Sequence, residues 1–152
     1  MDRARLATVD DADVIAQLLY DFNVEFDTPA PEVPKIAENL RVLLTGDDTF
    51  AFLAGAPPVG VGLVTLRPNV WYDGPVALLD ELYVVPDRRG EGIGSEMIEL
   101  FMAECRVRGV QLIEINVDES DVDAQRFYRR HGFSDIDPDS GERSSYYLQE
   151  LR

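Results

Sequence analysis

The sequence predicts an α/β fold whose sheet is built both by hairpins and by helical crossovers. Two observations carry this prediction: apolar residues recur with a period of two in some segments and about 3.6 in others, and glycine or proline clusters separate those segments. The predicted order of elements is β-α-α-β-β-β-α-β-α-β-β. Because 152 residues with 45% hydrophobic side chains suit one packed core, we expect residues 1–152 to form a single domain.

The first half of the chain predicts a strand, two helices and a hairpin. A weakly alternating strand comes first, and Thr8 and Asp11 have the spacing of a capping box before a helical apolar pattern. A proline-rich segment breaks that helix, Pro34 suits the first turn of the next one, and Gly46 ends it. Two β-rich runs then flank a glycine–proline turn. The predicted strands are 3–9, 49–54 and 59–67, and the predicted helices are 14–26 and 34–46.

The second half predicts a long crossover helix, a buried strand and a closing pair of strands. A strand stopped by Pro86 precedes a helix whose apolar residues repeat every three or four positions as far as Gly109. Cys105 lies on the apolar face of this helix, where a small core residue is expected. The predicted strands are 77–85, 112–117, 133–136 and 144–151, and the predicted helices are 93–109 and 121–132.

The charge balance excludes some classes of partner. The chain has 29 acidic and 14 basic residues, a net charge of −15 and a pI of about 4.3, which disfavours binding to nucleic acid or to an anionic membrane. No basic stretch followed by an apolar run opens the chain, and no apolar segment approaches the ~20 residues that span a bilayer. The single cysteine cannot form an internal disulfide. We therefore expect a cytoplasmic protein that binds neither nucleic acid nor membrane.

The segment Leu82–Ser95 carries the most specific chemical signal. An apolar strand runs into two arginines and three alternating glycines, Gly90, Gly92 and Gly94, and an amphipathic helix follows at once. Glycine allows positive φ and close approach of a ligand, so successive N–H groups can converge on an anion, and the helix N-terminus adds further donors. The segment predicts a pyrophosphate-binding turn. The alternative is a glycine-rich turn that only tightens the strand–helix connection.

Two common phosphate-binding loops do not fit this turn. A dinucleotide fingerprint needs a glycine where Ser95 stands, and a P-loop needs a Lys-Ser/Thr pair after the glycines. The spacing that fits is Arg-x-x-Gly-x-Gly, on Arg89, Gly92 and Gly94. With it the sequence resembles the GNAT superfamily of acyl-CoA-dependent N-acyltransferases, whose pyrophosphate loop is Gln/Arg-x-x-Gly-x-Gly/Ala at such a junction.

A second block strengthens this resemblance. Ile115-Asn116-Val117 on a predicted strand is followed, in family order and at family distance, by Asp121, Ala124, Phe127-Tyr128 and Gly132-Phe133. The resemblance spans essentially the whole chain. It implies a GNAT-like fold, which is a mixed, mostly antiparallel sheet with splayed central strands, flanked by helices.

The resemblance also implies where acetyl-CoA, the cosubstrate of the family, would bind. In GNAT enzymes the pantetheine arm fills the gap beside the strand before the loop, and its amides bond that strand much as a peptide does. The implied contacts are Leu82, Tyr83 and Val84 for pantetheine, and Arg88, Arg89, Gly90, Glu91, Gly92, Ile93 and Gly94 for the pyrophosphate. An ordinary buried strand is the alternative for residues 82–84. No metal is implied.

Two side chains are implied in the chemistry. Tyr128 matches a family tyrosine near the thioester sulfur, a general acid toward the departing thiolate; packing of its helix is the alternative. Glu81, with Asp80 as the lesser candidate, matches a carboxylate that takes a proton from an ammonium, directly or through a water. Because successive strand residues face opposite sides, only one of Asp80 and Glu81 should face the cleft. The alternative is that Asp80 and Glu81 are both solvated residues at the edge of the sheet with no catalytic role.

Asp121 departs from the family pattern. Where the family usually has an asparagine that contacts the cofactor from the start of the short helix, this chain has an aspartate. Aspartate caps a helix equally well, but its carboxylate cannot donate a hydrogen bond, so this cofactor contact is left open.

These residues predict an N-acetyltransferase that moves an acetyl group from acetyl-CoA directly to a primary amine, with no covalent enzyme intermediate. A non-catalytic acyl-CoA-binding or sensing module is the alternative. The predicted acceptor is a small-molecule amine or a peptide, and members of the family are often homodimers. Residues 1–87 hold 15 acidic and 5 basic side chains, which favours a cationic amine. The alternative is that these carboxylates only keep the protein soluble and do not select the acceptor.

Overall fold

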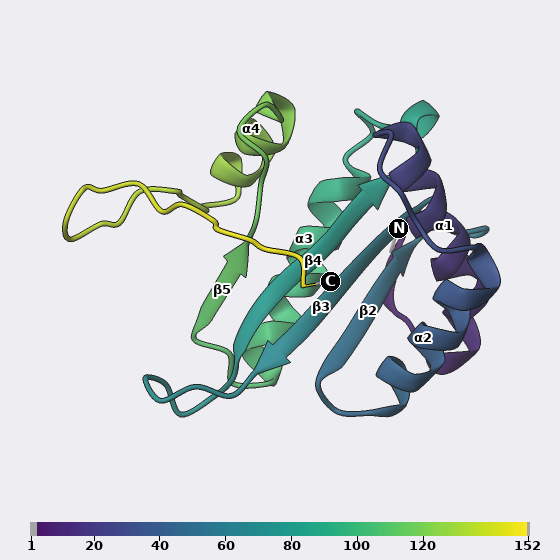
Figure 1. Cartoon of the computed structure of the whole chain (residues 1–152), viewed down its shortest axis with the longest axis horizontal. Coiled ribbons are helices and arrows are strands. Elements are labelled where there is room, and N and C mark those ends of the chain that lie inside the picture. Colours follow the sequence, from purple (N-terminus) through teal and green to yellow (C-terminus); the bar gives the residue numbers. More distant parts are fainter. Residues whose placement is uncertain (1–2, 152) are drawn as a thin grey trace. The chain divides into compact units, whose positions relative to one another are not determined.

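A five-stranded sheet with the spatial order β1-β2-β3-β4-β5 carries the fold (Figure 1). The computed structural model describes residues 3–151, and in it neighbouring strands are antiparallel except β4 and β5, which are parallel. The predicted mixed, mostly antiparallel sheet is therefore confirmed. The strands are β1 (Ala4–Leu6), β2 (Thr49–Ala54), β3 (Gly60–Arg67), β4 (Val76–Val84) and β5 (Leu112–Ile115).

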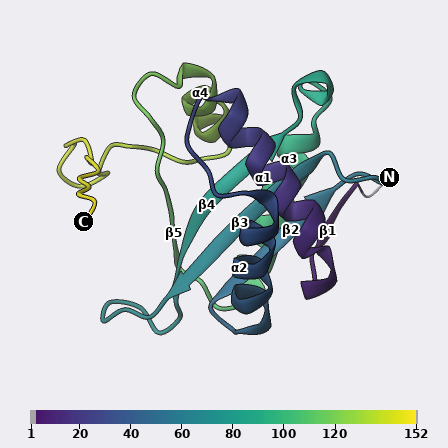
Figure 2. The same ribbon diagram turned by 45° about the vertical axis from the view of Figure 1, so that its right-hand side comes forward.

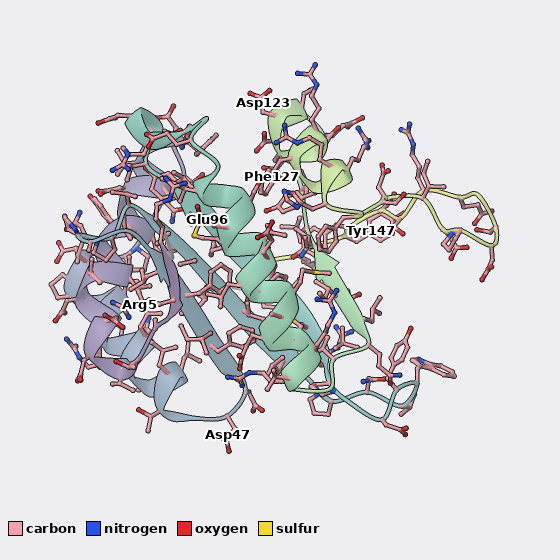
Figure 3. All side chains as sticks on the ribbon, turned by 180° about the vertical axis from the view of Figure 1, so that it is seen from behind. Arg5, Asp47, Glu96, Asp123, Phe127 and Tyr147 are labelled. Carbon is pink, nitrogen blue, oxygen red and sulfur yellow. The ribbon has the colours of Figure 1, made fainter. Side chains whose placement is uncertain are left out.

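Helices cover both faces of this sheet. Figure 2 shows α1 and α2 on one face, and Figure 3, seen from behind, shows α3 lying across the other. Two short 3₁₀ turns, η1 (Val9–Asp11) and η2 (Pro86–Arg88), precede α1 and α3. The helices are α1 (Ala12–Glu25), α2 (Val33–Thr45), α3 (Ile93–Val107) and α4 (Val122–Arg130). Within residues 3–151 no helix combines the length and the apolar character that crossing a membrane requires.

Local capping residues set several element ends where the sequence predicts them. The Thr8 N–H donates to the Asp11 carboxylate at 2.8 Å, which is one half of the predicted capping box. Pro34 lies in the first turn of α2, where no intrahelical partner for an N–H is needed. Gly46 is the C-cap of the same helix.

The two faces of the sheet have separate apolar cores. On the α1/α2 face, buried residues of the helices such as Ile15 and Leu40 pack with Leu53 and Val61 of β2 and β3. On the α3 face, the fully buried ring of Phe52 lies 5.8 Å from the ring of Phe101, measured between centroids. The alternation of side chains along β2 produces this division, since residues two apart share a face.

The chain divides into two compact units, one that ends at Ile115 and one that begins at Asn116. The first contains the whole sheet with α1, α2 and α3, and the second contains α4 and the C-terminal segment. That residues 1–152 act as a single domain stays a prediction.

Two predictions about strands in the last third of the chain are wrong. The strand predicted as buried, 112–117, ends at Ile115, and none of its residues is fully buried. The predicted closing pair 133–136 and 144–151 forms only one isolated bridge, between Ile136 and Arg143. The Asp137 carboxylate accepts from two N–H groups of the intervening turn, so the turn forms. Two strands joined by a turn are marginal without a packing partner, and Tyr147 is 91% exposed.

Glycine at position 62 allows the Phe52 ring to lie over β3, because a Cβ there would fall within that ring. We expect Gly62→Ala to lower the free energy of unfolding by about 1–3 kcal/mol, the usual cost of overpacking a core. Gly46→Ala is the matched control, since its Cβ would lie 3.6 Å from the Leu43 carbonyl, an ordinary contact. Urea denaturation of both variants measures the effect, and equal stabilities would contradict it.

Candidate active site

The glycine turn joins the end of β4 to the start of α3. Gly90 and Gly92 both have φ of +81°, a conformation that side chains with a Cβ rarely adopt. Nothing lies within 4 Å of the Cβ that either glycine would carry, so the space beside the turn is open. Gly92 is also the N-cap of α3, and it offers no side chain to cap the first N–H groups of that helix. These groups can therefore donate to an anion from outside the helix.

Both arginines of the turn pair with carboxylates. Arg88 donates to Glu91 at 2.9 and 3.2 Å, and this pairing lowers the pKa of Glu91 below its usual range. Arg89 donates to both carboxylate oxygens of Glu25, each at 2.8 Å. Both positive charges are thus paired within the protein, and the predicted contacts of Arg88 and Arg89 with a pyrophosphate stay predictions.

The upper part of β4 has one strand neighbour instead of two. The parallel register of β4 with β5 ends at the pair Leu79 and Ile115, although β4 continues to Val84. In the sheet that the described residues form, the far end of β4 is therefore bonded only to β3 on its other side. The family resemblance implies a splay of the two strands at this point, and that splay stays a prediction.

The orientation of the β4 backbone can be read from the bond that follows the strand. The Val85 N–H donates to the Val59 carbonyl at 2.9 Å, so Val85 faces β3, and so does Tyr83 two residues earlier. Leu82 and Val84 therefore direct their N–H and C=O groups to the side without a strand neighbour. Of the three predicted pantetheine contacts, these two have the orientation that the prediction requires. The contacts themselves stay predictions.

Asp80 and Glu81 both lie on the α1/α2 side of the sheet. The β3–β4 register pairs Leu63 with Glu81 and skips Asp80, which makes Asp80 the extra residue of a β-bulge. Leu63 packs against the α1/α2 core, and cross-strand partners share a face. Thr65, on the same face as Leu63, donates to the Asp80 carboxylate at 2.5 Å. The bulge interrupts the alternation of side chains, on which the expectation that only one of the two faces the cleft depends. Which of them faces a cleft stays a prediction.

Glu81 titrates near neutral pH. Its half-buried position, and to a smaller extent the negative charge of Asp80, raise the pKa of Glu81 from 4.5 to about 7. Partial desolvation also raises the pKa of Asp80, against the opposing effect of the Thr65 hydrogen bond. A carboxyl with a pKa near the working pH can accept a proton and release it again, as general base catalysis requires.

The remaining predicted residues lie in the unit that begins at Asn116. Asp121 caps α4 and accepts from the Ala124 N–H at 3.0 Å, so its carboxylate has the structural role that the sequence predicts. Tyr128 on α4 makes edge-on ring contacts with Phe127 and Phe133, at centroid distances of 5.4 and 6.0 Å. The proposed acid role of Tyr128 and the cofactor contact of Asp121 both stay predictions.

Sequence reasoning missed two contacts of the site. It counted Glu25 only among the 15 acidic residues of positions 1–87, whereas the structure pairs it with Arg89. It gave Thr65 no role, although this residue holds the Asp80 carboxylate. No local sequence signal could have found either contact, because each joins residues from different elements. Among residues 3–151 there is also no group of three or more His, Cys, Asp or Glu side chains that could hold a metal ion.

Comparison with known proteins gives the class of this protein. The model of the Acetyltransferase (GNAT) family matches residues 13–133, so the chain belongs to this family. Proteins of this family are acyltransferases that generally use acetyl-CoA. The resemblance that the two sequence blocks carry is confirmed.

Solved structures share the fold along the whole chain. A protein of Arthrobacter sp. FB24, provisionally named an acetyltransferase, is 48% identical with a TM-score of 0.93, over 99% of this chain and 97% of that one. An aminoglycoside acetyltransferase from an uncultured soil metagenomic sample is 21% identical with a TM-score of 0.81, over 99% and 96% of the two chains. The second likeness concerns the fold alone.

Curated relatives match over part of their length. An uncharacterized N-acetyltransferase of Methanocaldococcus jannaschii is 29% identical over 136 residues, which are 86% of this chain and 60% of the relative. The aminoalkylphosphonate N-acetyltransferase of Salmonella typhimurium is 32% identical over 75 residues, 48% of this chain and 49% of the relative. The chain spans 60% or less of the length of the curated relatives that it matches.

The raised pKa of Glu81 makes stability depend on pH. The folded protein retains the Glu81 proton between pH 4.5 and about 7, whereas the unfolded chain releases it near 4.5. The folded state thus binds more protons in this window, so we expect the contribution of Glu81 to stability to fall as the pH rises through it. Glu81→Gln removes this contribution, so the unfolding free energy of the variant relative to the wild type should increase from pH 5 to pH 8. Denaturant titrations at each pH measure this difference, and a pH-independent difference would show that Glu81 is not perturbed.

Proposed function

We propose that this protein is an N-acetyltransferase that moves an acetyl group from acetyl-CoA directly to a primary amine. The observation that carries the proposal is the position of Glu81. This carboxyl, with its pKa of about 7, lies on the stretch of β4 that has lost its β5 neighbour and leads into the glycine turn. A base and a binding edge for an extended ligand therefore occur on the same strand.

The residues present fit acetyl-CoA. Nothing lies within 4 Å of the Cβ that Gly90 or Gly92 would carry, so a ligand can approach the turn closely, as a pyrophosphate cradle requires. Leu82 directs its N–H and C=O, and Val84 its N–H, to the side of β4 that has no strand pairing, where the amides of pantetheine can add as a strand would. The Val84 carbonyl already accepts from Arg89. When bound, acetyl-CoA supplies the activated acetyl thioester.

The side chains then supply proton transfer. An amine acceptor arrives as an ammonium at neutral pH and must lose a proton before its nitrogen can attack. In the proposed mechanism Glu81 takes this proton, directly or through one water, and Tyr128 donates a proton to the departing thiolate. After the reaction Glu81 carries one extra proton and Tyr128 lacks one. The enzyme returns to its starting state when Glu81 releases its proton to solvent and Tyr128 takes one up.

Transfer to an amine tests the proposal. Purified protein mixed with acetyl-CoA and a panel of primary amines should release free thiol. We expect Glu81→Gln to lower kcat by about 10²- to 10⁴-fold and to abolish the rise of activity through pH 7, with CoA affinity unchanged. Tyr128→Phe should lower kcat by at least about tenfold, also without a change in CoA affinity.

Gly92→Val is the complementary variant, because it should affect CoA binding and not the proton-transfer residues. It adds a branched side chain at a residue whose φ is +81° and in the space where the pyrophosphate would lie, so CoA affinity should be lost. Its folding is checked by circular dichroism. Thermal stabilisation of the wild type by CoA with no thiol release on any amine would instead indicate a binding module.

The acceptor that we propose is a cationic amine. Asp80 and Glu81 lie on the α1/α2 side of the sheet, and Asp21 belongs to α1. The first 87 residues carry 15 acidic and 5 basic side chains, so this region attracts cations and repels carboxylates and phosphonates. The name of the Salmonella relative specifies an amine acceptor that also carries a phosphonate, which gives a matched comparison.

A diamine and an aminoalkylphosphonate of equal chain length distinguish these acceptor classes. We expect kcat/KM to be higher for the diamine and to fall when salt is raised, because screening over ~8 Å at physiological ionic strength weakens the attraction. The phosphonate should show the opposite salt dependence. A preference for the phosphonate, or no effect of salt on the diamine, would refute the cationic acceptor.

A further inference from the structure

The Arg89 guanidinium lies at the centre of a polar cluster to which the proposed mechanism gives no role. Its two terminal nitrogens donate to the two carboxylate oxygens of Glu25, each at 2.8 Å, and its Nε donates to the Val84 carbonyl at 2.9 Å. Glu25 is the last residue of α1, Val84 is the last residue of β4, and Arg89 directly precedes Gly90. One guanidinium therefore joins a helix end, the open strand edge and the glycine turn.

Tyr83 also donates to this carboxylate. Its hydroxyl donates to Glu25 Oε1 at 3.3 Å, and burial, together with the Glu25 charge, raises the pKa of Tyr83 so that it stays a donor. The buried Tyr83 ring stacks on Phe22 of α1, with centroids 4.8 Å apart and planes inclined by 12°. The Arg89 guanidinium carbon lies 5.6 Å from the centre of the Tyr83 ring. The Tyr83 hydroxyl that binds Glu25 is thus itself fixed by the packing of its ring.

The effect of this cluster is local. The side chains of Arg89 and Glu25 are 44% and 26% exposed, so the ion pair adds little to global stability in water. A bidentate carboxylate–guanidinium pair does impose a definite orientation. Gly90 and Gly92, which follow Arg89, are the residues with the greatest conformational freedom, and a ligand must immobilise them in order to use their N–H groups. Fixing Arg89 in advance lowers that entropic cost.

We propose that Glu25 is a positioning residue for the acyl-CoA site. It holds Arg89 against the Val84 carbonyl and so fixes the start of the glycine turn and the end of the open β4 edge before the ligand arrives. The inference rests on the proposed function, because it concerns the site for acetyl-CoA. Glu25 is not assigned to the acceptor site, because its negative charge is already compensated by Arg89. Its proposed effect is on the binding of the cosubstrate and not on the binding of the amine.

Glu25→Gln tests this role, since it keeps the side-chain length and removes the charge. We expect the Kd for CoA, measured by calorimetry, and the KM for acetyl-CoA to rise about tenfold, as loss of preorganisation predicts. The kcat and the KM for the amine should change by less than about twofold, because Glu25 touches neither the base nor the acceptor. If the Glu25 contact were purely structural, Glu25→Gln would lower the unfolding temperature without raising the KM for acetyl-CoA selectively over kcat.

Asp13→Asn is the matched control on the same helix. Asp13 at the start of α1 accepts from Arg41 of α2 at 2.7 Å, so the variant also breaks an ion pair of α1. It should leave CoA affinity unchanged. In a double-mutant cycle, Arg89→Gln should weaken CoA binding as much as Glu25→Gln, and the double variant should be no weaker than either, because both changes remove the same contact.

The outcomes separate the two proposals. If Glu25→Gln binds CoA as tightly as the wild type, or more tightly because a freed Arg89 reaches the phosphates, the positioning role is refuted and the proposed function stands. Additive effects in the cycle would also refute it. If the wild type binds no CoA at all, both the proposed function and this inference are refuted.

Discussion

The parting of β4 from β5 after Leu79 is the constraint on which the candidate site depends. Among residues 3–151, β4 pairs with a strand on each side below this point and with β3 alone above it. Bulges are concentrated at such edges, and the extra residue Asp80 follows at once. Beyond this point the Leu82 backbone groups and the Val84 N–H have no strand partner among residues 3–151, while the Val84 carbonyl accepts from Arg89. The bulge at Asp80 brings two carboxylates to one face.

The many carboxylates of the chain would repel an anionic cosubstrate. The fold places these carboxylates and the candidate anion-binding groups in different regions. Carboxylates lie on the α1/α2 side of β4, whereas the glycine turn presents N–H groups at the start of α3. Arg88 and Arg89 are paired with Glu91 and Glu25, so they add little free positive charge. Binding of a pyrophosphate would then depend on backbone dipoles that need no compensating side chain.

Local chemistry accounts for the elements that the sequence predicts well. The bounds of β2, Thr49–Ala54, agree with the prediction because β-forming residues end at a glycine–proline turn. Gly46 and Asp121 act as the predicted helix caps. The closing strands were not predictable in this way, since their propensity is β-like but no second partner is present in the part of the chain that the structure describes.

The sequence by itself determined the class of fold, the glycine turn and the membership of the acetyltransferase family, because all three depend on residues close together in the chain. Only the tertiary structure decided how the site residues are arranged. The bulge at Asp80 depends on the register with β3, the pKa of Glu81 on burial, and the orientation of Arg89 on Glu25 at the end of α1. Register, desolvation and long-range ion pairs arise between elements distant in sequence, and no local pattern encodes them.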